Sequence, residues 1–103
     1  METLLVKVKE NLILNHNEDD NLLLSFIAAA IAYAESYQRK PDGFYSENPM
    51  HPTTEQAVIM LSSYFYESRD GSTGGFFADN VKASKQVWNV VNMLLQLNKD
   101  VVI

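Results

Sequence analysis

The amino-acid sequence predicts an all-α fold, a small bundle of about four helices in a single domain that spans residues 1–103. Apolar residues recur every three to four positions in four separate stretches, which is the period of a helix with one buried face. Clusters of Gly, Pro, Asn and Asp separate these stretches, and no stretch shows the alternation that is typical of strands. A chain of this length builds one modest core, so a second domain is not expected.

Apolar stripes predict the first two helices, over about Thr3 to Leu14 and from Leu22 to about Arg39. The acidic run at residues 17–20 suits the exposed N–H groups and positive dipole end at the start of the second helix. Glu35 and Arg39 lie one turn apart and are expected to pair. The two stripes consist of Leu4, Leu5, Val8 and Leu12, and of Leu23, Phe26, Ile27, Ala30, Tyr33, Ala34 and Tyr37.

The opposite side of the second helix carries small residues where a solvated helix normally carries charge. We call Ser25, Ala29, Ala32 and Ser36 the small-residue ridge. One interpretation is a tolerant surface, since alanine is the best helix former. The other is a contact with a neighbouring subunit, because small side chains let another backbone approach closely.

A long loop is predicted from Lys40 to Pro52, where Pro and Asp-Gly signals end a helix or form turns. The third helix is expected to begin with Thr53 as N-cap and Gln56 three residues later, a capping box. Its body is apolar nearly all round, which indicates a central helix buried on several sides. Its main face is Ala57, Val58, Leu61, Tyr64 and Phe65, with Ile59 and Tyr66 on the other side.

The third helix is expected to end near Arg69, before a Gly-rich loop over residues 70–75. Phe76 and Phe77 follow, and they either tuck under the bundle or anchor a partner. The last helix, about Lys85 to Leu97, places five residues inward: Val87, Trp88, Val91, Leu94 and Leu95. Asn89, Asn92 and Gln96 are expected to point outward. The apolar tail Val101, Val102 and Ile103 either packs locally, stays disordered, or pairs with another chain.

Charge and composition exclude several function classes. The net charge of −5 has the wrong sign for a protein that holds nucleic acid through its phosphates. No cysteine occurs, so disulfides and thiolate zinc sites are excluded and a cytoplasmic setting is expected. Neither a signal peptide nor a membrane-spanning stretch is predicted.

The sequence also offers no catalytic, cofactor or metal site. His16 and His51 fall in predicted loops and lack zinc-site spacing. The segment 71–75 lacks the Lys-Ser/Thr of a phosphate loop, and the acidic run lacks the pattern of a calcium loop. We therefore expect that the protein is not an enzyme.

Three stretches together resemble the gp6-like head-tail connector family of tailed phages. The first is the short helix up to Leu14 followed by residues 19–24 and the long helix ending at residues 34–37. The second is residues 56–61 running into 64–69, similar to the family's aromatic-Tyr-Glu-Asn-Arg helix end, with Ser68 in place of Asn. The third is a Gly-containing loop followed by Val87 to Leu97, similar to the family's terminal Val-x-x-Leu-Leu helix.

This resemblance implies a structural protein that forms a ring of identical subunits below the portal of a phage or prophage head. Its expected partners are further copies of itself, the portal protein, and tail-completion or stopper proteins. Genome DNA would pass through the channel without specific binding, and the acidic composition suits such a channel. The protein would act in the host cytoplasm during assembly and then in the virion.

The candidate subunit or partner contacts are the small-residue ridge, the end of the third helix, the aromatic pair and the tail. The alternative function is a small DNA-binding packaging or regulatory protein, and a third is a helical domain that binds one host or phage protein. The contact residues are Ser25, Ala29, Ala32, Ser36, Tyr66, Glu67, Arg69, Phe76, Phe77, Val101, Val102 and Ile103.

Overall fold

The computed structural model describes residues 2–69 and 81–100, and in these ranges it contains five helices and no strand. They are α1 (Glu2–Leu12), α2 (Asp20–Gln38), α3 (Phe44–Glu47), α4 (Pro52–Ser68) and α5 (Val81–Gln96). The predicted all-α class is confirmed. The four longer helices are those that the apolar stripes predict, whereas α3 is a single turn inside the segment expected to be a loop.

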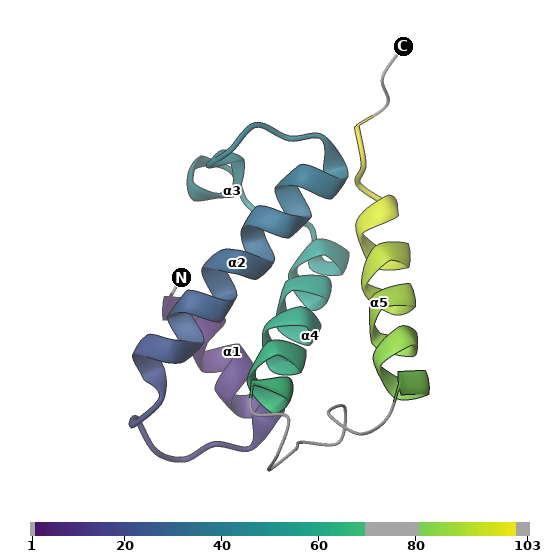
Figure 1. Cartoon of the computed structure of the whole chain (residues 1–103). Coiled ribbons are helices and arrows are strands. Elements are labelled where there is room, and N and C mark those ends of the chain that lie inside the picture. Colours follow the sequence, from purple (N-terminus) through teal and green to yellow (C-terminus); the bar gives the residue numbers. More distant parts are fainter. Residues whose placement is uncertain (1, 70–80, 101–103) are drawn as a thin grey trace.

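Helix α4 lies at the centre and packs against α1, α2 and α5 (Figure 1). Ala57, Val58 and Leu61 are buried on one side of α4, and Ile59 and Tyr66 are buried on the other. The nearly uniform apolar composition of this helix therefore reflects contact with neighbours on several sides, as the sequence predicts.

The core consists of two groups of buried side chains that share helices α2 and α4. The first group joins α2, α4 and α5, and the second joins α1, α2 and α4. The central α2–α4 pair therefore holds α1 and α5. The first group is Ala30, Ala34, Ala57, Val58, Leu61, Val91 and Leu95, and the second is Val8, Leu23, Ile27, Ile59 and Tyr66.

The connection after α2 is tied back to that helix. Arg39 adopts a left-handed conformation with φ 62°, and the N–H groups of Arg39 and Lys40 donate to the carbonyl oxygens of Ser36 and Glu35 at 3.2 and 2.8 Å. This is a Schellman ending, and it turns the chain sharply away from the helix axis.

The predicted pairing of Glu35 with Arg39 is wrong, because the Glu35 carboxylate binds the connection after α2 instead. Its two oxygens accept hydrogen bonds from the backbone N–H groups of Gly43 and Tyr45, at 3.2 and 3.0 Å. Glu35 is only 4% exposed, and its negative charge lies at the first turn of α3. These bonds hold the short helix against α2, and no local pattern in residues 40–52 predicts them.

The predicted Thr53 N-cap is wrong. Helix α4 begins at Pro52, and its N-cap is His51, two residues before Thr53, with no side-chain cap bond. Proline is favoured at a first helical position because its missing N–H would have had no partner there. The Thr53 hydroxyl instead accepts a hydrogen bond from Asn98 Nδ2 at 2.8 Å. This bond joins the start of α4 to the segment after α5.

A fully buried amide joins the ends of α2, α4 and α5. Gln38 Nε2 donates to Thr54 Oγ1 at 2.9 Å and to the Leu95 carbonyl oxygen at 3.0 Å, and Gln38 Oε1 accepts from the Tyr45 hydroxyl. Asn98 Nδ2 also donates to Thr54 Oγ1, at 3.2 Å. The amide is thus satisfied at both its nitrogen and its oxygen, as burial requires.

Candidate assembly surfaces

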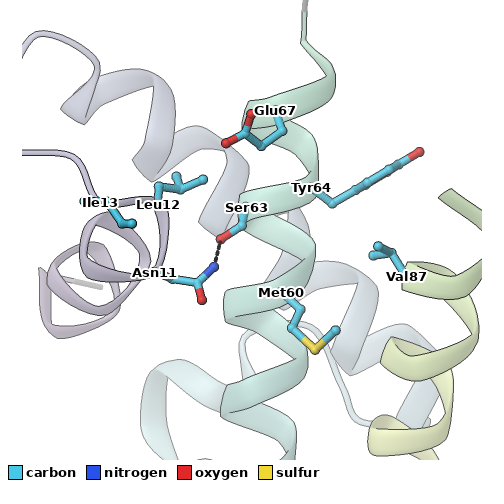
Figure 2. Close-up of a pocket in the computed structure, with 8 residues that line it drawn as sticks. All are labelled: Asn11, Leu12, Ile13, Met60, Ser63, Tyr64, Glu67 and Val87. Atoms are coloured by element: carbon cyan, nitrogen blue, oxygen red, sulfur yellow. Dashed lines mark hydrogen bonds between the residues drawn. The ribbon is translucent and has the colours of Figure 1, made fainter. Parts of the chain in front are cut away.

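An apolar groove of about 470 Å³ runs along α4 between the end of α1 and the start of α5. Figure 2 shows Met60 and Glu67 toward opposite ends of it, with Leu12 on the α1 side. Asn11 Nδ2 donates to Ser63 Oγ at 2.7 Å, which ties α1 to α4 within the groove. The groove is lined by Asn11, Leu12, Ile13, Met60, Ser63, Tyr64, Glu67 and Val87.

Ile13, at the edge of this groove, combines two unfavourable features. Its backbone is left-handed with φ 59°, a conformation that a β-branched residue rarely adopts. Its side chain is 90% exposed. The N–H groups of Ile13 and Leu14 donate to the carbonyl oxygens of Glu10 and Lys9 at 3.2 and 2.9 Å, so α1 also ends in a Schellman motif. Glycine is the usual residue at this position.

A second groove of about 390 Å³ lies over α2, between the start of α1 and the α3 segment. Ala28 and Ala32 of α2 line it together with Leu4, Tyr45 and Met50. All four members of the small-residue ridge, Ser25, Ala29, Ala32 and Ser36, are exposed. The ridge therefore lies on the outside of the monomer, with Ala32 at this groove.

The three candidate residues at the end of α4 have different surroundings. Tyr66 is 7% exposed, its hydroxyl donates to the Asp19 carboxylate, and the Arg69 guanidinium lies 3.9 Å above its ring. The hydrogen bond to Asp19, followed by burial, raises the pKa of Tyr66. Glu67 lines the groove along α4. Tyr66 thus ties the turn before α2 to the end of α4, while Glu67 and Arg69 remain accessible.

Phe76, Phe77, Val101, Val102 and Ile103 lie outside the described residues. His16 and His51 are both exposed, and His16 Nδ1 accepts from the Glu18 N–H at 3.3 Å. Within residues 2–69 and 81–100, no three His, Asp or Glu side chains gather closely enough to hold a metal ion. In the same ranges no helix has both the length and the apolar character needed to span a membrane.

Among the residues that the structure describes, three lysines pair with carboxylates from other parts of the chain. Lys7 pairs with Glu55 at 2.5 Å, Lys9 with Asp20 at 2.9 Å, and Lys40 with Asp100 at 2.5 Å. Lysines paired in this way are poor phosphate ligands, because binding would have to displace the carboxylate. Asp20 of the predicted acidic run therefore forms an ion pair in the first turn of α2, whereas Asp19, the N-cap, makes no side-chain cap bond.

Of an exposed row on α5, only Asn89 was predicted from the sequence to point outward. We call Lys85, Asn89, Met93 and Leu97 the α5 outer ridge: they are spaced by four residues, and all are exposed. Met93 and Leu97 are 61% and 67% exposed. The four-residue spacing could have predicted this row, because residues four apart share a helix face. This face lies opposite the inward-facing Val91 and Leu95. Asn92, expected to point outward, is half-buried and accepts from the Tyr33 hydroxyl at 2.6 Å.

Comparison with protein families matches residues 2–92 to the model described as phage gp6-like head-tail connector protein. The match includes α1 to α4 and most of α5. No curated protein and no solved structure matches the chain.

Proposed function

The chain belongs to the phage gp6-like head-tail connector family, and on that premise we propose that it forms a ring below the portal and prepares the DNA-filled head for tail attachment. Family membership gives the chain a structural connector role in a phage rather than an enzymatic one. The observation that carries the proposal is the family match over residues 2–92. The protein would act in the host cytoplasm during assembly and remain at the head-tail junction of the virion.

The surfaces of the monomer support assembly into a closed ring. Different residues form the two grooves and the α5 outer ridge, and the described part of the chain fills neither groove. Contacts between different surfaces of identical subunits repeat from copy to copy and close a ring when the rotation allows it. Further copies of the chain are therefore proposed as its main partners, with the portal above and tail-completion or stopper proteins below.

The charge distribution supports a channel through which DNA slides. The net charge is −5, and three lysines of the described part of the chain are paired with carboxylates. A lining of this sign repels phosphate instead of holding it. The alternative of a DNA-binding packaging or regulatory protein has no support from the fold or from the family match.

Removal of the gene from its phage or prophage tests this function. We expect DNA-filled heads to accumulate without tails, and expression of the parent chain from a plasmid to restore joined particles. Electron microscopy of the restored heads should show a ring at the portal vertex. Normal tailed particles in the absence of the chain would refute the connector role.

Ala32→Arg tests the small-residue ridge as a subunit contact. Ala32 is exposed in the monomer, so a long charged side chain should leave the unfolding midpoint unchanged while it blocks close approach of another subunit. We expect helical circular dichroism like that of the parent but no rings and no completed heads. Gln56→Arg, at an exposed position of α4, is the matched control. Normal assembly of the Ala32→Arg chain would show that the ridge is plain surface.

A further inference from the structure

We propose that the groove along α4 receives the α5 outer ridge of a second copy of this chain, with Lys85 of the ridge paired to Glu67 of the groove. The inference rests on the proposed ring and names the contact that would build it. Groove and ridge are different surfaces of one chain, so each copy would offer a groove to one neighbour and a ridge to the other.

Shape and apolar character favour this pairing. Met93 and Leu97 are 61% and 67% exposed on the ridge, whereas Leu12 and Met60 line the groove. A row of side chains spaced by four residues is the kind of ridge that fits between two neighbouring helices. Burial of these methionine and leucine side chains removes apolar surface from water on both copies.

The lengths of the two surfaces also agree. Lys85 and Met93 are eight residues apart on α5, and Met60 and Glu67 are seven residues apart on α4. At the rise of an α-helix these separations are about 12 Å and about 10 Å. With Lys85 beside Glu67, Met93 therefore lies near Met60 at the other end of the groove, and Leu97 lies one helical turn beyond it.

Charge sets the direction of the ridge in the groove. Glu67 and Lys85 take no part in the ion pairs formed within the described ranges, which involve Lys7, Lys9 and Lys40. A lysine brought to Glu67 from a neighbour would meet an accessible carboxylate at a partly dehydrated position, where attraction is stronger than in bulk water. The opposite orientation would place Met93 at the carboxylate.

Ile13 gives a further reason to expect a partner at this groove. In the monomer, a 90% exposed isoleucine in a left-handed conformation contributes little packing, and its backbone conformation is unfavourable. A docked ridge would cover this side chain at the groove edge and remove its apolar surface from water.

Charge reversal tests the contact, with self-association measured by sedimentation velocity and native mass spectrometry at matched ionic strength. Glu67→Lys and Lys85→Glu should each weaken self-association at least about tenfold, because like charges then meet across the contact. An equal mixture of the two variants should recover assembly, because each groove then meets a ridge of opposite charge. Glu47→Lys, an exposed charge reversal on α3, should associate like the parent. Circular dichroism and the unfolding midpoint verify that each variant folds.

The outcomes separate this contact from the ring itself. A mixture that associates no better than either variant alone, or single variants that associate like the parent, would overturn the contact. Rings of the parent seen at portal vertices would then leave the proposed function standing. Absence of self-association by the parent, both in solution and on heads, would overturn both. A Glu67→Lys chain that forms rings but no longer joins tails would show that the groove binds a different virion protein, which also overturns this inference.

Discussion

Two helices of this protein end on residues that rarely adopt the left-handed conformation. Ile13 and Arg39 have φ values of 59° and 62°, and each supplies one of the two N–H groups of a Schellman ending. The left-handed conformation brings the Cβ of an L-residue close to the following carbonyl oxygen, a cost that glycine avoids. At both positions the backbone hydrogen bonds of the turn therefore stabilise the helix end by more than the left-handed conformation costs.

Ile13→Gly should stabilise the monomer by about 1 kcal/mol, since relief of the left-handed strain exceeds the added flexibility of the unfolded chain. Arg39→Gly is the matched control, with the same backbone geometry at a position that does not line the groove. Urea denaturation of both variants measures the effect. If the groove docks a neighbour, only Ile13→Gly should also weaken self-association. A lower midpoint for Ile13→Gly would mean that its side chain packs within the monomer.

The hydrogen bond from Tyr66 to Asp19 should make stability depend on alkaline pH. The pKa of Tyr66 is raised above 10.0, first by this bond and then by burial. The unfolded chain therefore loses the phenol proton before the folded protein does. Stability from this group is complete below about pH 10 and is lost as the pH rises through the folded-state pKa.

Tyr66→Phe should cost about 1.5 to 3 kcal/mol at neutral pH, the usual contribution of a hydrogen bond to a charged acceptor. Its stability should also fall less steeply than that of the parent between roughly pH 9 and pH 11. Burial raises the pKa of Tyr33 as well, and Tyr33 is present in both proteins, so the difference isolates Tyr66. Urea denaturation across this range is the measurement. Parallel pH profiles would contradict the assigned bond.

Among the helices, positions were predictable from the sequence and ends were not. The buried faces of α2, α4 and α5 follow from apolar spacing, because burial against neighbours imposes the helical period on the sequence. The ends depend on partners far away in the chain. Glu35 accepts hydrogen bonds from the N–H groups of Gly43 and Tyr45, and the Thr53 hydroxyl accepts one from Asn98. Local sequence patterns predicted other partners for both side chains, because they take no account of residues elsewhere in the chain.

The buried cluster at the ends of α2, α4 and α5 gives a test at this scale. Thr54→Val keeps the shape of the side chain but removes the oxygen that accepts from Gln38 and Asn98. The buried amide of Gln38 and the half-buried amide of Asn98 then each lose an acceptor, and we expect a loss of about 1 to 3 kcal/mol. Thr53→Val removes one bond at a half-buried position and should cost less than about 1 kcal/mol. Equal losses in denaturant titration would contradict the central role of Thr54.

At the scale of the whole molecule, the family was predictable because its helix order and spacing span most of the chain. The candidate surfaces were predictable only in part. Glu67 and Ala32 were named from the sequence, but the grooves beside them depend on how α1, α3 and α5 approach the central helices. The spacing of residue types along the sequence does not determine how these helices are arranged around the central pair.

The charge of the whole molecule predicts how it behaves with DNA. A chain of net charge −5 releases few counterions when it meets duplex DNA, so we expect no salt-sensitive affinity at physiological ionic strength. Fluorescence anisotropy with a labelled duplex, at two salt concentrations, makes the measurement. Submicromolar binding that weakens steeply with added salt would favour the DNA-binding alternative over the connector.

The bond between Glu35 and the Gly43 N–H also bears on chemical ageing. Asp-Gly sequences such as Asp42-Gly43 isomerise when the backbone nitrogen of the glycine attacks the aspartate carboxyl group and closes a five-membered imide. Here that nitrogen is engaged by a buried carboxylate at 3.2 Å, and the glycine is held at φ 82°. We expect this restraint to slow ring closure in the folded protein. A particle that waits a long time between hosts would benefit, since a damaged subunit in a finished virion is never replaced.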